Sequence, residues 1–319
     1  MRRALGAASL EIPVPRFDLD LVVRSHGWYD LPPFSWKGEE GRLEFVFLDG
    51  DSPIKVEVSA TRDALVVRAG RPALRGGSFT FEDETPQLMP SRPLVPRSRL
   101  VSVVTRVLDL SADLSAFHAL CRERASEGFG WIAERGAGRI LRAPTLFEDA
   151  VKVLATTNCT WGLTKVMIGN LIARFGRRGA FPGAAFVAGL GAHEIEALKF
   201  GYRAPYLAAF AERVASGKLD LARWEDPSRP DAEVEKEIRA EKGFGPYAAD
   251  TLGRLLGRHG KLGLDSWSRR KVAEIRFRGR PVKDARVERT YRSFGPKAGL
   301  AFWLDVTRDW HEGRERLWP

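Results

Sequence analysis

Ala240-Glu-Lys-Gly-Phe-Gly-Pro-Tyr-Ala-Ala-Asp250 is the stretch from which the fold can be predicted, because two glycines stand there between two helical patterns. Residues 231–242 and the apolar residues after Pro246 both have helical spacing. Gly243 and Gly245 let the chain turn sharply, and proline is tolerated in the first turn of a helix. The stretch predicts two helices joined by a tight hairpin. Such a hairpin either binds phosphate through backbone N–H groups at a helix N-terminus or is only a turn.

Asp265 follows the hairpin by about twenty residues, at the start of a further helical pattern over residues 266–275. Aspartate is among the best N-caps, so capping is the ordinary explanation for it. Hairpin and aspartate together resemble the signature of the helix-hairpin-helix DNA glycosylase superfamily. In that family the hairpin binds DNA and the aspartate does the chemistry. The resemblance implies that Asp265 is catalytic and that the DNA-binding residues include Gly243, Phe244, Gly245 and Tyr247.

Length and composition are those of a globular protein. The chain has 319 residues, of which 44% are hydrophobic, enough for two domains with a sizeable core. It has no run of eighteen apolar residues and no secretory signal, so we expect a cytoplasmic, nucleoid-associated protein without membrane contact. Cys121 and Cys159 match no metal spacing. We therefore expect neither a metal nor another cofactor, although the hairpin leaves room for a monovalent cation.

The positive charge is concentrated at the C-terminal end. Residues 260–319 hold 15 basic and 8 acidic side chains, so +7 of the formal net charge of +10 lies there. A basic surface can serve solubility alone, but a bias beside a candidate phosphate-binding hairpin suggests a polyanionic partner. We expect a monomer that binds double-stranded DNA containing a damaged base, with Arg269 and Arg270 among its contacts.

The first third of the chain has the pattern of an antiparallel sheet. Short alternating or β-branched runs, separated by turn residues, predict strands over residues 17–24, 42–48, 54–58, 65–68 and 101–110. The proline-rich residues 86–100 read as an irregular linker. From residue 113 onward the pattern is helical. The expected fold is α+β, with an antiparallel β domain over residues 1–112 and an all-α helix-hairpin-helix domain over residues 113–319.

Residues 17–21 and the aromatic turn that follows resemble the opening of one glycosylase branch, which repairs oxidised guanine and alkylated purines. The turn here, over residues 25–36, is longer and lacks the glutamine of that branch. This departure weakens the case for oxidised guanine as substrate. For Trp28, Tyr29 and Trp36 we expect packing in the core.

A polar stretch, residues 155–161, interrupts a long apolar helical pattern that begins at Leu146 and resumes to Phe175. A helix–helix turn capped by Thr and Asn is the ordinary explanation. The stretch also resembles the turn from which this branch inserts a residue into the duplex gap left by an extruded nucleotide. The resemblance implies that Asn158 is this wedge.

Gly201-Tyr202-Arg203-Ala204 resembles a further segment of the same branch. The resemblance implies that Tyr202 buttresses the opened duplex and that Arg203 contacts the base left unpaired. Core packing of the tyrosine and an exposed arginine are the alternatives. Oxidised-guanine enzymes have a second arginine at the place of Leu163, so strict pairing with cytosine is not expected.

A glycosidic bond inside a duplex is unreachable, so an enzyme of this kind must extrude the nucleotide into a pocket. Asp265 can stabilise the positive charge that develops on the sugar and activate water. The candidate base-pocket aromatics are Trp161, Tyr247 and Trp267, with core packing as the alternative. Bifunctional relatives have a lysine two residues after the second hairpin glycine, where this chain has Tyr247.

We therefore expect a monofunctional enzyme without lyase activity, which leaves an abasic site. Among the possible substrates we rank alkylated purine first, mismatched uracil or thymine second and oxidised guanine third. A non-catalytic lesion-binding protein is the alternative of a different class, but binding alone does not need a carboxylate near phosphates.

Overall fold

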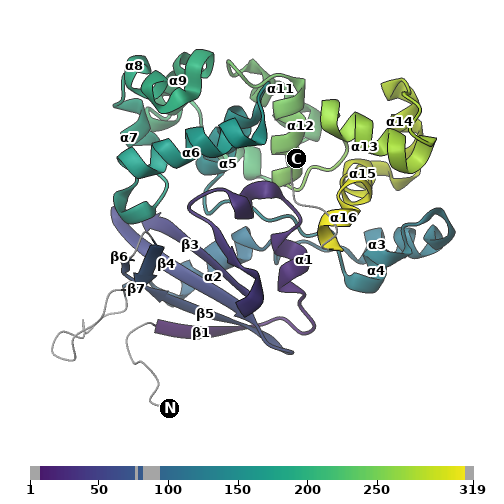
Figure 1. Cartoon of the computed structure of the whole chain (residues 1–319), viewed down its shortest axis with the longest axis horizontal. Helices are drawn as coiled ribbons and strands as arrows, with labels where there is room; N and C mark the ends of the chain where they lie inside the picture. The colour runs from purple at the N-terminus through teal and green to yellow at the C-terminus, as the bar shows by residue number, and fades with distance from the viewer. Residues whose placement is uncertain (1–7, 76–77, 82–93, 313–319) are drawn as a thin grey trace.

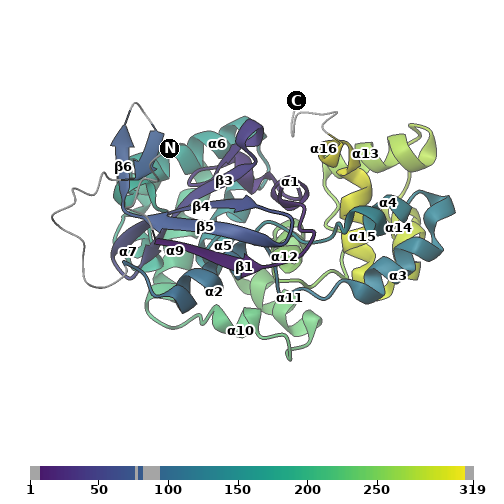
Figure 2. The same cartoon turned by 90° about the horizontal axis from the view of Figure 1, so that it is seen from below.

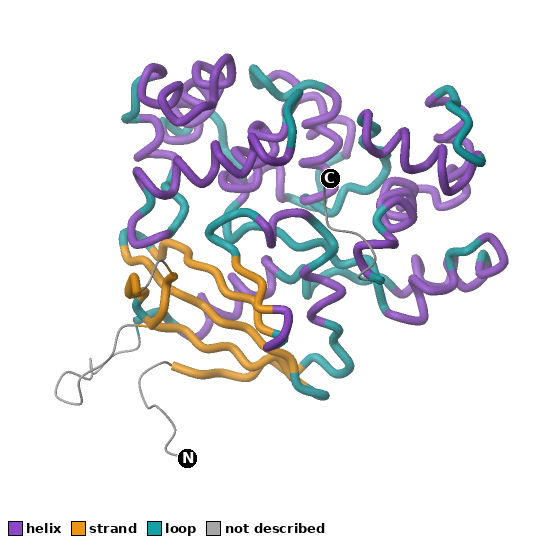
Figure 3. Tube along the Cα trace, in the orientation of Figure 1, coloured by secondary structure: helices purple, strands orange, loops and turns teal. Residues whose placement is uncertain are grey.

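The computed structural model describes residues 8–75, 78–81 and 94–312. Its first third forms a five-stranded antiparallel sheet in the order β1-β5-β4-β3-β2, and a two-stranded β6-β7 pair lies beside it (Figures 1 and 3). The strands are β1 Ala8–Pro13, β2 Ser35–Lys37, β3 Arg42–Asp49, β4 Ser52–Ala60, β5 Ala64–Gly70, β6 Pro72–Arg75 and β7 Ser78–Phe81.

The centre of the sheet follows the period-2 pattern of the sequence. Apolar residues two apart on β3 lie opposite apolar residues of β4 and are buried with them on one face. These pairs are Leu43 with Val58, Phe45 with Val56 and Phe47 with Ile54. The strands predicted over residues 42–48, 54–58 and 65–68 are confirmed.

The strand predicted over residues 17–24 is wrong, because this segment forms the short helix α1 Leu19–Val23. The Asp18 side chain caps the helix by accepting the backbone N–H of Leu21 at 2.9 Å. Successive residues of the helix are buried rather than alternate ones. The Asp-Leu-Asp-Leu run thus begins with an N-cap residue, and the hydrogen bond of its side chain to the helix N-terminus favours a helix over a strand.

The strand predicted over residues 101–110 is also wrong, since helix α2 occupies Arg97–Val107. Its buried residues are Leu100, Val103, Val104 and Val107, which have the i, i+3, i+4, i+7 spacing of one helix face. Burial of this face overrides the β propensity of the valines. The expected linker therefore ends in a helix, and its residues 86–93 lie outside the described part of the chain. The other two strands of the five-stranded sheet are β1 and β2 instead.

The rest of the described chain is helical, as predicted. The helices are α3 Ser115–Glu123, α4 Gly130–Arg135, α5 Leu146–Thr156, α6 Trp161–Phe175, α7 Ala184–Ala188, α8 Ala192–Ile195, α9 Ala204–Ala215, α10 Ala222–Glu225, α11 Asp231–Ala240, α12 Pro246–Leu255, α13 Ser266–Phe277, α14 Asp284–Tyr291, α15 Ala298–Val306 and α16 Arg308–His311. Across the described ranges, none of these helices combines the length and apolarity needed to cross a membrane.

The helices form two groups with the end of α1 and the turn after it between them (Figures 1 and 2). Helices α3 and α4 pack beside the C-terminal helices, where the Phe294 ring lies 6.1 Å from Phe117 and 4.8 Å from Phe129. Side chains from the sheet and from both helical groups join one apolar core. The domain boundary near residue 112 stays a prediction. The consequence for the site is that residues 25–30 contact both groups.

Candidate active site

The hairpin between α11 and α12 has the backbone that its glycines predict. Gly243 has φ +91°, and a Cβ there would lie 2.7 Å from Leu154 Cδ1 and 2.9 Å from Tyr206 Cδ2. Both the conformation and the space therefore require glycine. Phe244, by contrast, is 1% exposed and packs 5.0 Å from the Phe210 ring. The ring thus fixes the hairpin from inside and is not available to DNA, so the predicted DNA contact of Phe244 is left to its backbone and stays a prediction.

Gly245 is the N-cap of α12, and Pro246 is its first residue. No atom would lie within 4 Å of a Cβ on Gly245, so this face of the hairpin is open. Among the described residues no side chain caps this helix. Its first-turn N–H groups therefore face outward and can bind an anion.

Asn158 lies at the tip of the turn between α5 and α6. Its backbone is left-handed, with φ +46°, and its side chain is exposed. The side-chain amide donates a long hydrogen bond of 3.5 Å to the Tyr202 hydroxyl, and Tyr202 is itself 53% exposed. The turn thus presents two polar, solvent-accessible side chains next to each other.

Arg203 is buried against this turn. Only 4% of the residue is exposed, and its guanidinium donates to the Thr157 carbonyl and, at 3.2 Å, to the Thr157 hydroxyl. Its Cζ lies 4.4 Å from the centre of the Tyr202 ring. The alternative of an exposed arginine is therefore wrong. The contact of Arg203 with the unpaired base stays a prediction; in this structure the guanidinium holds the residue before Asn158.

A groove connects this turn with the hairpin. Its volume is about 580 Å³, and its lining includes Asn158, Tyr202, Gly243 and Gly245. Two basic side chains, Arg239 and Lys242, and the start of α12 line it as well. Three segments that the sequence analysis selected separately therefore form one continuous surface.

Asp265 is the N-cap of α13 and forms a capping box with Ser268. Its Oδ1 accepts the backbone N–H of Ser268 at 2.7 Å, and the Ser268 hydroxyl accepts the N–H of Asp265 at 2.9 Å. Within the described part of the chain, Oδ2 has no hydrogen-bond partner. Capping thus fixes the carboxylate and still leaves one oxygen for other use.

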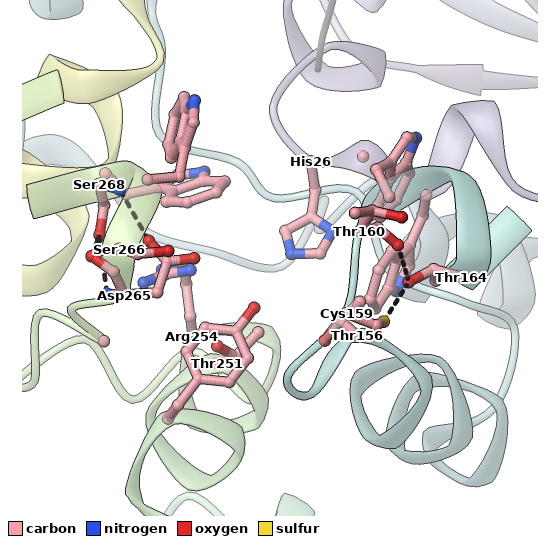
Figure 4. A pocket seen from close by; sticks show the side chains of 17 residues that line it. His26, Thr156, Cys159, Thr160, Thr164, Thr251, Arg254, Asp265, Ser266 and Ser268 are labelled. Carbon is pink, nitrogen blue, oxygen red and sulfur yellow. Dashed lines mark hydrogen bonds between the residues drawn. The ribbon is translucent and has the colours of Figure 1, made fainter. Parts of the chain in front are cut away.

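A cavity of about 260 Å³ lies in front of this carboxylate. Figure 4 shows Asp265, Ser266 and Ser268 on one side of it and Thr160 and Thr164 on the other. The residues predicted as base-pocket aromatics, Trp161, Tyr247 and Trp267, all line it. The fold therefore brings together the catalytic candidate and all three aromatic candidates in one cavity.

Each aromatic candidate is held in place. The Trp161 indole donates to Asp30 at 2.8 Å, and the Trp267 ring lies 6.3 Å from Trp303. Burial, followed by the charge of Asp265, raises the pKa of the Tyr247 phenol, which therefore stays protonated at neutral pH.

Comparisons with solved structures identify this architecture. No family model matches the sequence, and none of the curated proteins matches it. The 3-methyladenine DNA glycosylase of Archaeoglobus fulgidus superposes with a TM-score of 0.71 at 14% identity, over 94% of this chain and 98% of that one. The chain has the fold of the helix-hairpin-helix DNA glycosylases.

Two other structures agree. MBOgg1 in complex with a low-affinity DNA ligand has a TM-score of 0.69 at 19% identity, over 94% of this chain and 96% of that one. The 8-oxoguanine glycosylase/lyase of Clostridium acetobutylicum, without ligand, has a TM-score of 0.66 at 18% identity, over 95% of this chain and 98% of that one. The expected fold class is thereby confirmed.

The lining of the cavity also includes residues that were not selected from the sequence as site residues, among them His26, Trp28, Arg254 and Trp303. Trp28 is in the core as expected, yet one face borders the cavity. Arg254 is 3% exposed, stacks 4.2 Å from the Trp303 ring centre and donates to the Leu262 carbonyl at 2.9 Å. Burial lowers the pKa of Arg254 to about 10, so it remains a cation at neutral pH.

The two predicted phosphate contacts on α13, Arg269 and Arg270, differ in whether their side chains are already paired within the protein. Arg269 forms a bidentate ion pair with Asp284, with both N–O distances at 2.9 Å. Arg270, next to it, is exposed. The described residues contain no cluster of His, Cys, Asp and Glu able to hold a metal ion. The expectation of a monovalent cation at the hairpin stays a prediction.

Proposed function

We propose that the protein is a monofunctional DNA glycosylase that removes a damaged base, first of all an alkylated purine, from double-stranded DNA. The observation that carries this proposal is the cavity in which the Asp265 carboxylate faces aromatic walls from several other parts of the chain. The fold shared with the 3-methyladenine and 8-oxoguanine enzymes supports it.

The path of DNA follows from the groove and the cavity. The N-terminus of α12 binds a backbone phosphate, and the groove beside it places the duplex against Asn158. Asn158 occupies the gap left by the extruded nucleotide, and the base enters the cavity. The exposed Arg270 adds sequence-independent attraction to the phosphates.

Asp265 then acts on the sugar. The glycosidic bond breaks and its electron pair leaves with the base, so positive charge develops at the sugar C1′ and O4′. The carboxylate, preorganised by its capping box, stabilises this charge and accepts a proton from the water that adds to C1′. A cationic alkylated purine leaves as a neutral base and needs no proton donor. Because His26 is neutral, the cavity carries one positive and one negative side chain, Arg254 and Asp265, and so has no net charge that would repel such a base.

The lining of the cavity supports hydrolysis without strand cleavage. None of its described lining residues is a lysine. Lys152 approaches from behind the wall: its Nζ lies 5.9 Å from the Trp28 ring centre, on a fully buried side chain paired with Glu148 at 2.6 Å. An amine nucleophile for attack on C1′ is thus missing from the cavity, and water is the remaining nucleophile.

The test is product analysis on a panel of duplexes containing alkylated purines, mismatched uracil or thymine, or 8-oxoguanine. We expect release of a free base and an abasic site that breaks only on later alkali treatment. Asp265→Asn, which keeps the capping geometry, should lower the single-turnover rate on the order of a hundredfold or more while lesion binding persists. No base release from any duplex would favour the alternative of a non-catalytic lesion-binding protein.

Tyr247→Lys is the matched variant for the reaction type. It places an amine in the cavity at the position that bifunctional enzymes of this superfamily use. We expect a borohydride-trappable enzyme–DNA adduct with this variant and none with the wild type. An adduct with the wild type would overturn the monofunctional assignment.

A further inference from the structure

The His26 imidazole points into the cavity, and no described protein group uses either ring nitrogen. Nδ1 is shielded from solvent without a hydrogen-bond partner. Nε2 also bonds no described group, and it is the nitrogen that the cavity reaches, since the residue lines the cavity while being only 4% exposed overall. Figure 4 shows the ring between the Asp265 side and the Thr160 side.

The position of His26 is fixed from both sides. The backbone carbonyl of Ser25 accepts the Trp303 indole N–H at 2.8 Å, and the Ser25 hydroxyl accepts the Leu141 N–H at 2.8 Å. On the other side the Trp28 indole donates to Asp149 at 2.8 Å. The imidazole packs edge-on against Trp28, with ring centres 4.2 Å apart. The ring is therefore preorganised and does not depend on a ligand for its orientation.

The environment keeps His26 neutral. Burial lowers the pKa of His26 well below its usual range, and the positive charges of Arg254 and Lys152 lower it further. A neutral imidazole has one N–H donor and one acceptor nitrogen. It can therefore hydrogen-bond a base without adding a charge that would repel a cationic one.

A purely structural role for His26 does not explain why a buried ring nitrogen is left without a hydrogen-bond partner. The His26 ring lies 4.2 Å from Trp28 and 5.8 Å from Trp303 between ring centres. A phenylalanine would fill the same space without the cost of a buried, unpaired nitrogen. The geometry of a flipped nucleotide supplies the missing partner. With the sugar at Asp265, the base extends across the cavity, and its far edge meets the His26 ring, which lies between the Asp265 side and the Thr160 side.

We propose that His26 is a specificity-determining residue whose Nε2 forms a hydrogen bond with the polar edge of the extruded base. The inference rests on the proposed function, because it takes the occupant of the cavity to be a purine-type base. It assigns to the turn after α1 a direct contact with that base, made by a side chain. Apolar bicyclic molecules of the same size have no group that can hydrogen-bond Nε2, so His26 does not increase their affinity.

The experiment measures binding of free bases to the whole protein, so it does not depend on excision. The probes are 3-methyladenine and, as an apolar bicycle of similar size, 1-methylindole. In protein carrying ¹⁵N-labelled histidine, 3-methyladenine should shift the His26 ring resonances saturably and leave those of the exposed His193 unchanged. His26→Phe should weaken 3-methyladenine binding about tenfold, the loss of one hydrogen bond, and leave 1-methylindole binding unchanged.

Three results would overturn the inference: no binding of 3-methyladenine to the wild type, binding without a His26 shift, or equal weakening of both probes by His26→Phe. His26→Gln, which keeps hydrogen-bonding groups, should retain part of the preference for 3-methyladenine and serves if His26→Phe fails to fold. Base excision is scored separately. A protein that binds base through His26 but releases none from DNA refutes the proposed function and leaves this inference standing.

Discussion

Arg203 holds the turn that carries Asn158, so its removal should weaken lesion-specific binding through Asn158. The guanidinium is buried and makes two hydrogen bonds to Thr157, the residue before the left-handed Asn158. Arg203→Ala removes both bonds and leaves the Thr157 carbonyl without its charged donor. The turn is then less ordered in the free protein, and the free energy needed to order it on binding weakens the affinity for DNA.

The size of the effect follows from that ordering. Fixing the backbone of one residue costs roughly 1–2 kcal/mol, and two residues of the turn, Thr157 and Asn158, depend on Arg203. Because neighbouring helices α5 and α6 still restrain both ends of the turn, we expect about half of the cost for the two residues together to appear in binding. This is about 1–2 kcal/mol, or roughly a 5- to 30-fold loss of affinity. Asn158→Gly tolerates the same backbone and should lose a similar amount by deleting the wedge itself.

The assay is fluorescence anisotropy on a duplex with a stable abasic-site analogue and on the same duplex without it. Arg203→Ala, Asn158→Gly and the double variant form a cycle, with the remote, exposed Arg122→Ala as the control for loss of one positive charge. If Arg203 acts through the turn, the double variant binds no worse than Asn158→Gly alone. Additive losses would refute this reasoning and favour a direct contact of Arg203 with the unpaired base.

Three further predictions concern charge, packing and pH. Arg270→Gln should weaken binding to lesion and undamaged duplexes alike and reduce the slope of log affinity against log salt by about one, whereas an unchanged slope would exclude a phosphate contact. A Cβ on Gly299 would lie 1.9 Å from the Lys261 carbonyl oxygen, so Gly299→Ala should lower the free energy of unfolding, measured in urea, by about 2 kcal/mol or more. The control is Gly253→Ala, which should not lower it, because the nearest atom to a Cβ there is 3.5 Å away. Burial lowers the pKa of His311 to about 4, so below about pH 6.5 the unfolded chain binds a proton at this residue and the folded chain does not. Between pH 7 and pH 4.5 the free energy of unfolding of the wild type should therefore fall by about 2–3 kcal/mol more than that of His311→Gln. Equal losses in the two proteins would contradict this role of His311.

Local signals made the hairpin and the carboxylate predictable. Glycines that need a positive φ, a proline in the first helical turn and an aspartate N-cap act within a few residues, so Gly243, Pro246 and Asp265 could be placed from sequence alone. Tertiary packing decided the cases that went wrong. The valines of α2 favour a strand by propensity, but burial of one helix face selected a helix. Packing also places the ring of Phe244, which lies between two glycines and completes a core that only the folded α9 provides.

His26 could not be selected from sequence for a related reason. Its surroundings depend on contacts between residues far apart in the chain: Ser25 with Trp303, and Trp28 with Asp149. No spacing rule connects such positions, and a single histidine in an aromatic turn has no signature of its own. The sequence of this turn showed only that it is longer than the turn of the branch it resembles and lacks that branch's glutamine. The cavity has its histidine in this same turn.

The walls of the cavity explain why one carboxylate can suffice for the proposed chemistry. Four tryptophans border it, and three of them direct the indole N–H to a partner: Trp28 to Asp149, Trp161 to Asp30, and Trp303 to the Ser25 carbonyl. Their polar edges are thereby satisfied, and apolar ring faces remain for the cavity. A base that fills the space excludes water, and the attraction between Asp265 and a sugar cation is then much stronger than it would be in solvent. Because its capping box already fixes the carboxylate, the proposed reaction needs little reorganisation when that charge develops. On this proposal, the same local structure that begins α13 also prepares the site for bond cleavage.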